Sequence, residues 1–351
     1  MQAAQFVGFG QEPKVVEVPD PTPGVGEVVI RVGGAGACHS DLHVLYDFDP
    51  AVLPMPWQAP FTLGHENAGW VHELGGGVSG LEIGQPVAVY GPWGCGRCAR
   101  CAVGAESYCE DPAAGPGGSG GLGLDGGMAT YLKVPSARLL VPLPEGLSPQ
   151  AAAPLTDAGL TSYHAIARSM HKLGPSSTAV VIGAGGLGHL AIQLLTATCA
   201  ARVVAVDSKP EALDLARELG ADLAVAPSAG TVAELRAFTR GRGADVVLDF
   251  VGSDGSIGIG IGCARTLGDV TVIGIAGGTA SFGFFSVPYE VSLQTTYWGT
   301  RPELVDVLEL AARGSISART TVSPLSDAPA VYRALREGSV IGRAVIDPSL
   351  G

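Results

Sequence analysis

The chain has 351 residues and a formal net charge of −12 at pH 7, with 46% hydrophobic and 15% charged residues. This length allows about two domains of ordinary size. The negative balance disfavours nucleic acid and anionic membranes as partners, since both are bound through clustered Lys and Arg. No apolar run approaches the roughly 20 residues of a membrane helix, and residues 1–13 lack the basic and apolar regions of a secretory signal. We therefore expect a soluble, cytoplasmic protein.

The first part of the chain, over 15–141, consists of short apolar runs separated by Gly and Pro. Typical runs are 27–32, 70–74 and 86–90. This pattern predicts a β-rich, barrel-like architecture. The Gly-rich stretch 115–127 carries few side chains and predicts a flexible loop between strands.

The character of the sequence changes near Ser148. A helix is expected over 149–170, and apolar β-branched strands then alternate with amphipathic helical segments, which is typical of parallel βαβ units. The expected strands are 179–183, 202–207, 223–226, 245–250 and 269–274, and the expected helices are 210–220 and 231–240.

Two later segments depart from this alternation. The stretch 253–262 is rich in glycine where the fold needs a helix, and each glycine costs about 0.5–1 kcal/mol there relative to Ala, so a weak helix is expected. Past residue 289 the alternation fades, with one more helix at 301–313 and a final strand at 344–346. We expect this tail to return to the first domain.

Four cysteines form the most specific signal of the chain. Their spacing, C-x-x-C-x-x-C-x7-C, lets one loop place four thiolates around a single tetrahedral zinc with no position left for water, which indicates a structural site. An iron–sulfur cluster is the alternative for four such cysteines, and elemental analysis separates the two. The odd total of seven cysteines favours reduced thiols over a disulfide framework. The four residues are Cys95, Cys98, Cys101 and Cys109.

A glycine-rich turn follows the apolar strand that ends near Ile182. Glycines let the turn be tight and let the backbone approach a pyrophosphate, whose charge the free N–H groups at the helix start can bind. Asp207 ends the next strand, near the offset of about 20 residues expected of an acid that binds the ribose 2′-hydroxyl, and its charge disfavours a 2′-phosphate. The sequence therefore predicts a site for NAD in preference to NADP. The residues of the turn are Gly183, Gly185, Gly186, Leu187 and Gly188.

Three further segments carry side chains that can bind metals: 38–41, 64–66 and 154–157. A lone Cys, His or Asp is more often a core or capping residue, and sequence spacing alone does not assemble them. These motifs nevertheless resemble the zinc-containing medium-chain dehydrogenase/reductase family and, within it, the bacterial secondary alcohol dehydrogenases. The resemblance also includes the segment of the four cysteines, 95–109, which we call the four-cysteine lobe, together with the glycine turn and the segments 297–301 and 342–343. The resemblance covers nearly the whole chain.

The resemblance implies a fold class and a second metal site. The fold is α/β: a GroES-like β-barrel catalytic domain, 1–154 and 291–351, with a Rossmann doubly wound parallel sheet over 155–290. It implies that Cys38, His65 and Asp157 bind a catalytic zinc with an open fourth position, giving two zinc ions per subunit. Asp157 stands where many relatives have Cys.

The resemblance also implies roles beyond the metal. Zinc acts as a Lewis acid on the alcohol oxygen, Ser40 relays the proton, and His43 exchanges it with solvent or is a surface residue without a role. Glu66 is expected to be a second-sphere or transient ligand, or a structural charge. Arg343 matches the arginine that contacts the cofactor diphosphate. Trp57, Tyr297 and Trp298 are candidates for the walls of an apolar substrate pocket, with ordinary packing as the alternative.

These features predict an NAD-dependent zinc alcohol dehydrogenase that interconverts secondary, medium-chain or aryl, alcohols and ketones. Alternatives are a primary-alcohol or aldehyde dehydrogenase and a polyol dehydrogenase, because pocket size is not readable from sequence. A zinc-free quinone reductase or structural relative is disfavoured by the seven ligand candidates. A binding module that senses dinucleotide is disfavoured by the open zinc position. The family forms dimers and tetramers, so a homo-oligomer is expected.

Overall fold

The computed structural model describes residues 1–47 and 57–350, and its chain divides into two compact units. Unit 1 comprises Met1–Leu160, Gly299–Gly314 and Ala318–Gly351, and unit 2 comprises Thr161–Trp298 and Ser315–Ser317. Unit 2 therefore starts and ends a few residues later than the Rossmann domain expected over 155–290. No helix of the described residues combines the length and the apolarity needed to cross a bilayer.

Unit 1 is built on mainly antiparallel sheets, in which only the last two strands and one short two-stranded pair run parallel. Its strands are β1 (Gln2–Phe6), β2 (Lys14–Glu17), β3 (Val28–Ala37), β4 (Phe61–Thr62), β5 (Glu66–Leu74), β6 (Pro86–Val89), β7 (Ser119–Gly120), β8 (Gly123–Leu124), β9 (Tyr131–Val134), β10 (Leu140–Pro142), β17 (Thr320–Pro324) and β18 (Arg343–Asp347). Its helices are α1 (His39–Leu42), the π-helix η1 (His43–Asp47), α2 (Ala99–Ala102), α3 (Pro149–Ala152), α9 (Arg301–Ala312) and α10 (Ala328–Arg336), with 3₁₀ turns η2 (Glu106–Tyr108), η3 (Pro112–Ala114), η4 (Ala137–Leu139), η5 (Ala153–Thr156) and η7 (Leu325–Asp327).

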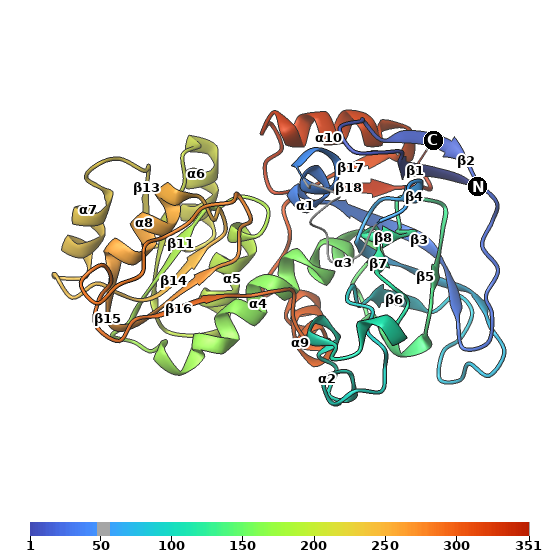
Figure 1. Ribbon diagram of the computed structural model, residues 1–351, viewed down its shortest axis with the longest axis horizontal. Coiled ribbons are helices and arrows are strands. Elements are labelled where there is room, and N and C mark those ends of the chain that lie inside the picture. The colour runs from blue at the N-terminus through green and yellow to red at the C-terminus, as the bar shows by residue number, and fades with distance from the viewer. Residues whose placement is uncertain (48–56, 351) are drawn as a thin grey trace. The chain divides into compact units, whose positions relative to one another are not determined.

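The main sheet of unit 1 joins both ends of the chain. Its strand order is β10-β6-β5-β3-β18-β17, with β9 also paired to β3. Figure 1 labels β3, β5, β6, β17 and β18 of this sheet. The register sets Ala344 of β18 opposite Ala37 of β3, and Gly36 opposite Glu66 of β5. The pairing of β3 with β5 and β18 therefore brings the start of β5 and the start of β18 to the carboxyl end of β3. The next residue after β3 is Cys38, so this corner of the sheet positions the first metal-competent side chain.

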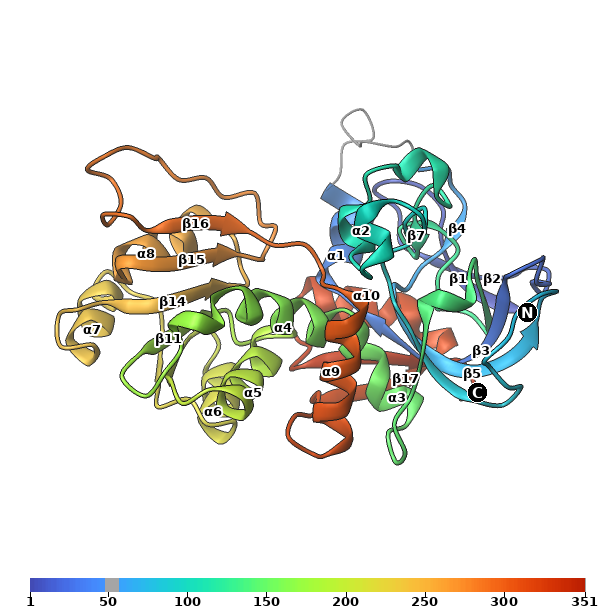
Figure 2. The same ribbon diagram turned by 90° about the horizontal axis from the view of Figure 1, so that it is seen from below.

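Unit 2 is a parallel sheet covered by helices. Its elements are α4 (Ala158–Ser169), η6 (Met170–Lys172), β11 (Thr178–Ile182), α5 (Gly188–Thr198), β12 (Arg202–Val206), α6 (Pro210–Glu218), β13 (Leu223–Val225), α7 (Thr231–Phe238), β14 (Ala244–Asp249), α8 (Asp254–Cys263), β15 (Ala264–Val272) and β16 (Ser292–Thr295). The strand order β13-β12-β11-β14-β15-β16 is that of a doubly wound nucleotide-binding fold, and Figure 2 shows β11, β14, β15 and β16 side by side. The predicted fold class and all five predicted strands of this sheet are confirmed.

The core of unit 2 follows the buried strands. The central strand β11 is fully buried along its length, as its apolar run predicts for a strand covered on both faces. Helices α5 and α6 pack against each other and against β11–β13, while α7 packs against α8, which covers β14 and β15. Sheet order places the topological switch between β11 and β14, and ligands of such folds bind at the carboxyl ends of strands at this point.

Three expectations are refined by the structure. The predicted helix over 149–170 is interrupted at Asp157, whose backbone (φ −128°, ψ −65°) lies outside the helical region between η5 and α4. The glycine-rich stretch 253–262 does form helix α8, started by a capping box between Ser253 and Ser256. The expected flexible loop over 115–127 is wrong in one respect. A Cβ on Gly121 or Gly126 would lie 2.5 Å or less from backbone atoms of Gly64, so the loop is closely packed there.

Candidate metal and dinucleotide sites

The first cluster gathers three side chains from separate segments of unit 1. Cys38 follows β3, His65 precedes β5, and Asp157 lies at the break between η5 and α4. Asp157 Oδ2 lies 3.8 Å from Cys38 Sγ and 3.5 Å from His65 Nε2. Ligands of one tetrahedral zinc would lie about 3.6 and 3.4 Å apart for these atom types. With Glu66, whose carboxylate also comes close, the four candidate ligand atoms lie within 4.8 Å of one another.

The chemistry of this donor set fits zinc. A thiolate, an imidazole and a carboxylate are the ligand types that zinc takes, and three protein ligands leave the fourth position for substrate. Cys38 and His65 are buried, and the Asp157 side chain is 13% exposed. Burial lowers the pKa of His65, but Asp41, Asp157 and Cys38 together raise it well above its ordinary value. The surroundings of the imidazole are thus strongly negative, as a site for a divalent cation requires.

A charged pair lies beside these residues. Glu66 and Arg343 are both almost fully buried and form an ion pair, and Arg343 Nη1 lies 3.8 Å from Cys38 Sγ. Burial raises the pKa of Glu66 to about 7, while Arg343 opposes this rise. The Glu66 carboxylate also accepts a hydrogen bond of 3.3 Å from the N–H of Ala158, next to the metal-competent Asp157. Glu66 therefore links the starts of β5 and β18 to the helix break at Asp157.

Sequence reasoning missed Asp41. Its Oδ1 lies 2.9 Å from His65 Nδ1, and its Oδ2 accepts the N–H of Cys38 at 3.0 Å. A carboxylate on the second ring nitrogen fixes the tautomer and orientation of a ligating histidine. The sequence does show an acidic residue within one helical turn of Cys38. Such a residue is equally well explained as the cap of a short helix, so it does not by itself indicate a partner of a metal ligand.

The structure places the predicted proton-relay residues near the same corner. Ser40 is half-buried, with Oγ 3.5 Å from Cys38 Sγ. The His43 side chain is 22% exposed, and its Nδ1 lies 2.7 Å from Asp47 Oδ2. Ser40 thus lies against a metal-competent residue and His43 is accessible to solvent, while their roles stay predictions.

The second cluster is the four-cysteine lobe. Its four sulfurs lie within 4.8 Å of one another, and Cys95 Sγ is 3.9 Å from Cys101 Sγ, against about 3.8 Å for two thiolates on one tetrahedral zinc. Backbone N–H groups of Cys101 and Glu110 donate to Cys98 and lower its pKa to about 6. The backbone N–H of Cys95 donates to Cys109 Sγ at 3.3 Å. These donors stabilise thiolates, which are the metal-binding form of cysteine.

Residues outside the segment 95–109 also hold the four-cysteine lobe in place. Arg138 donates to the carbonyl oxygen of Gly94 at 2.8 Å and forms an ion pair with Glu106. Arg301 N, at the start of α9, donates to the carbonyl oxygen of Gly104 at 2.7 Å. Burial raises the pKa of Cys101, the most enclosed of the four thiols, to about 12. A bound cation would remove this cost of holding Cys101 as a thiolate.

The dinucleotide turn lies in unit 2, between β11 and α5. Gly183 has φ +86°, and a Cβ on Gly188 would lie 1.8 Å from the carbonyl oxygen of Gly183, so only glycine fits this close turn. Asp207 Oδ2 accepts the N–H of Ala184 at 2.7 Å, and its Oδ1 accepts the N–H of Lys209 at 2.9 Å. The acid expected to bind the ribose therefore lies against the glycine turn that is expected to bind the pyrophosphate.

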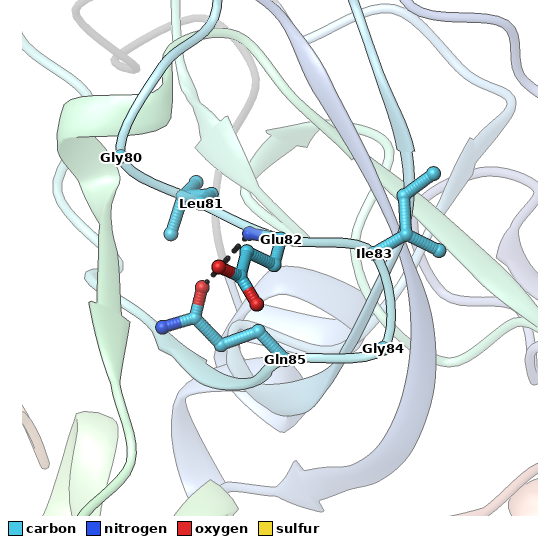
Figure 3. A pocket seen from close by; sticks show the side chains of 6 residues that line it. All are labelled: Gly80, Leu81, Glu82, Ile83, Gly84 and Gln85. Atoms are coloured by element: carbon cyan, nitrogen blue, oxygen red, sulfur yellow. Dashed lines mark hydrogen bonds between the residues drawn. The ribbon is translucent and has the colours of Figure 1, made fainter.

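The expected pocket residues belong to different units. Trp57 is half-buried in unit 1 and contacts Phe61 edge-to-face at a centroid distance of 6.2 Å. Tyr297 is 55% exposed and Trp298 is buried at the end of unit 2, with ring centroids 5.9 Å apart. Their role as pocket walls stays a prediction. A surface hollow of about 650 Å³, lined by 80–85, contains none of the candidate site residues (Figure 3).

Comparison with known proteins identifies both halves of the chain. Residues 24–145 match the family model of the alcohol dehydrogenase GroES-like domain, and residues 186–313 match that of the zinc-binding dehydrogenase. The NAD-dependent alcohol dehydrogenase of Sulfurisphaera tokodaii is 34% identical over 356 residues, covering 99% of this chain and 100% of the relative. The D-arabinose 1-dehydrogenase (NADP(+)) of Saccharolobus solfataricus is 33% identical, covering 99% and 97%.

Solved structures give the same result. The alcohol dehydrogenase of Aeropyrum pernix superposes with a TM-score of 0.90 at 34% identity, covering 99% of this chain and 100% of that one. The acetophenone reductase of Geotrichum candidum, solved in complex with NAD, gives 0.85 at 28% identity, covering 99% and 96%. With both domains matched, and with one cluster of four cysteines and one of Cys38, His65, Glu66 and Asp157 in place, the chain belongs to the zinc-containing medium-chain dehydrogenase/reductase family of oxidoreductases.

Proposed function

We propose that the protein is an NAD-dependent alcohol dehydrogenase that interconverts secondary, medium-chain or aryl, alcohols and ketones. The observation that carries the proposal is the convergence of Cys38, His65 and Asp157 in one corner of unit 1. Zinc held there supplies a Lewis acid that favours loss of the alcohol proton, and NAD supplies the hydride acceptor. The four-cysteine lobe holds a second, structural zinc.

Residues of the chain can carry the proton that the alcohol loses from the site to solvent. Ser40 lies against Cys38 with a rotatable hydroxyl that both accepts and donates, so it can pass a proton outward. The His43 side chain is partly exposed, so its imidazole can exchange that proton with solvent. Arg343, held by Glu66, is the candidate for binding the cofactor diphosphate.

The preference for a secondary alcohol has support from one relative, the acetophenone reductase. The related D-arabinose 1-dehydrogenase supports the alternative of a polyol or sugar substrate, and primary alcohols are a further alternative. Trp57, Tyr297 and Trp298 favour an apolar substrate if they line the pocket.

The test is zinc content per subunit together with NADH-linked turnover of 2-alkanols, 1-phenylethanol, primary alcohols and sorbitol. We expect about two zinc ions, one for each cluster, and the fastest turnover with a secondary alcohol. Iron in place of zinc would overturn the assignment of the four-cysteine lobe. Faster turnover of sorbitol or of primary alcohols would replace the substrate class while leaving the enzyme class intact.

A separate prediction concerns the cofactor. Asp207→Asn keeps an oxygen able to accept the N–H of Ala184 but removes the charge that disfavours a 2′-phosphate. The ratio of kcat/KM with NAD to kcat/KM with NADP should fall by about tenfold, equivalent to ~1.4 kcal/mol. Steady-state kinetics with both cofactors measure this ratio. A wild-type enzyme that already prefers NADP would contradict the assignment of Asp207.

We further propose a cytoplasmic homo-oligomer, a dimer or tetramer. None of the seven cysteines, all of which lie among the described residues, forms a disulfide, which suits a reducing compartment. Strand β16 ends the order of its sheet, and the segment before it exposes Phe282, Phe284 and Phe285 by 75%, 75% and 89%. A sheet edge beside an apolar patch suits pairing with a second copy of the chain. Light scattering of the native protein measures the subunit number, and a monomer would contradict this part of the proposal.

A further inference from the structure

A tyrosine from the C-terminal helix reaches the residues around the proposed catalytic metal. Tyr332 lies on the buried face of α10 with Ala328 and Leu335, and only 1% of it is exposed. Its hydroxyl donates to Asp41 Oδ2 at 2.9 Å, across 291 positions of sequence. The hydroxyl also lies 3.1 Å from Met128 Sδ. The single proton goes to Asp41, because an ionised carboxylate is the stronger acceptor and a thioether a weak one.

Asp41 divides its two oxygens between two metal-competent residues. Oδ1 holds the ring of His65, while Oδ2 accepts both the N–H of Cys38 and the hydroxyl of Tyr332. Asp41 is completely buried, so water does not replace a lost donor. Rotation of this carboxylate would change the orientation of His65 and the start of α1 together. The donors on Oδ2 therefore decide how firmly the carboxylate holds the imidazole.

The tyrosine is itself well fixed. Burial and the neighbouring charge of Asp41 raise the pKa of Tyr332 well above its ordinary value, so the hydroxyl keeps its proton. Helix α10 contacts α1 directly, as Figure 1 also shows. Arg336 lies over the Tyr46 ring at 4.3 Å, and Arg333 pairs with Glu12 at 2.8 Å. The helix is thus anchored by contacts other than the hydroxyl of Tyr332.

We infer that Tyr332 is a positioning residue for the catalytic zinc, which acts by holding Asp41 in the orientation that fixes His65 and Cys38. The inference rests on the metal site proposed above. It assigns the C-terminal helix a role in metal retention that its amphipathic sequence does not reveal. Loss of a group that is hydrogen-bonded directly to a metal ligand, as Asp41 is, typically costs 10–100-fold in metal affinity or activity, so for Tyr332, one step further from the metal, we expect the lower end of this range.

The test is the rate of zinc release from the intact holoenzyme to an excess of a chelating dye. Two phases are expected, and the one missing from Asp157→Ala belongs to the catalytic site. Tyr332→Phe, which keeps the ring, should accelerate this phase by roughly tenfold and leave the phase of the four-cysteine lobe unchanged. An unchanged rate for both phases, in an enzyme that holds two zinc ions, would overturn the inference while leaving the proposed function standing.

Three matched variants separate positioning from packing. Tyr90→Phe removes another buried hydroxyl of unit 1, one that donates to the carbonyl oxygen of Gly299, and should leave the catalytic phase unchanged. Met128→Leu should also leave the catalytic phase unchanged. If this variant accelerated the catalytic phase, the inference that Tyr332 acts through its hydrogen bond to Asp41 would be overturned. In an Asp41→Asn background, Tyr332→Phe should add little, because the two act through one hydrogen bond. Additive effects would contradict the inference, and the melting temperatures show whether each variant is folded.

Discussion

Asp157→Ala is expected to lower the turnover of alcohol by roughly 10³-fold and to remove one zinc ion per subunit. Polarisation by a bound metal contributes several kcal/mol to such reactions, and about 4 kcal/mol corresponds to this factor in rate. The fold should persist, because the Asp157 side chain is partly exposed and its backbone already interrupts the helix. Elemental analysis, steady-state kinetics and the melting temperature of the same preparation measure the three quantities.

Two companion variants make this result specific. Asp157→Cys restores a charged ligand of the type that many family members use, so it should recover the second zinc and part of the turnover. Asp214→Ala removes an aspartate that is 72% exposed and paired with Arg217, and should change neither quantity. Full turnover together with full zinc content in Asp157→Ala would refute the ligand assignment.

Features that a short stretch of sequence determines could be predicted, and features that depend on contacts between distant segments could not. The four cysteines lie within 15 positions of one another, 95–109, so their spacing alone indicates a metal site. The central strand β11 of unit 2 is a continuous apolar run because both faces of the sheet are covered there. Five of the six strands of this sheet were predicted to within about five residues, whereas the edge strand β16 was not predicted. The proposed catalytic zinc site of Cys38, His65 and Asp157 instead joins segments up to 119 positions apart, and only the family resemblance connected them.

The residues that sequence reasoning missed share a physical reason. From their own segments, Asp41 is interpreted as a helix cap and Tyr332 as an aromatic residue of the core. Nothing in either segment indicates that the two side chains form a hydrogen bond with each other. The interruption of the expected helix over 149–170 does have a local signal, because Pro154 lies in η5 directly after α3. The non-helical backbone of Asp157 itself has no such signal in the sequence. Packing between glycines 121 and 126 and the turn at Gly64 is equally non-local, so composition suggested flexibility there. Local sequence propensity thus predicted the helices and strands, whereas tertiary contacts determine which side chains meet in the metal site.

Cys101→Ser is expected to act on stability before activity. Cys101 is the most enclosed thiol of the lobe, so its loss leaves three ligands around a cation that needs four. Structural zinc contributes its binding free energy to folding. A loss on the order of 4 kcal/mol would lower the melting temperature by about 5 °C for a chain of 351 residues. The zinc content should fall by one ion per subunit, with the ion of the catalytic cluster retained.

The effect should also reach the start of α9. Gly104 of the lobe accepts the N–H of Arg301, and Ser107 donates to the carbonyl oxygen of Gly299 at 3.0 Å. Hydrogen exchange over 299–305 should therefore speed up in Cys101→Ser, because these backbone contacts depend on an ordered lobe. Cys199→Ser, a half-buried cysteine at the end of α5, is the matched control and should change neither the zinc content nor exchange at α9. If Cys101→Ser kept two zinc ions and its melting temperature, the lobe would not be the structural metal site, because a tetrahedral site cannot lose a thiolate without a loss of affinity.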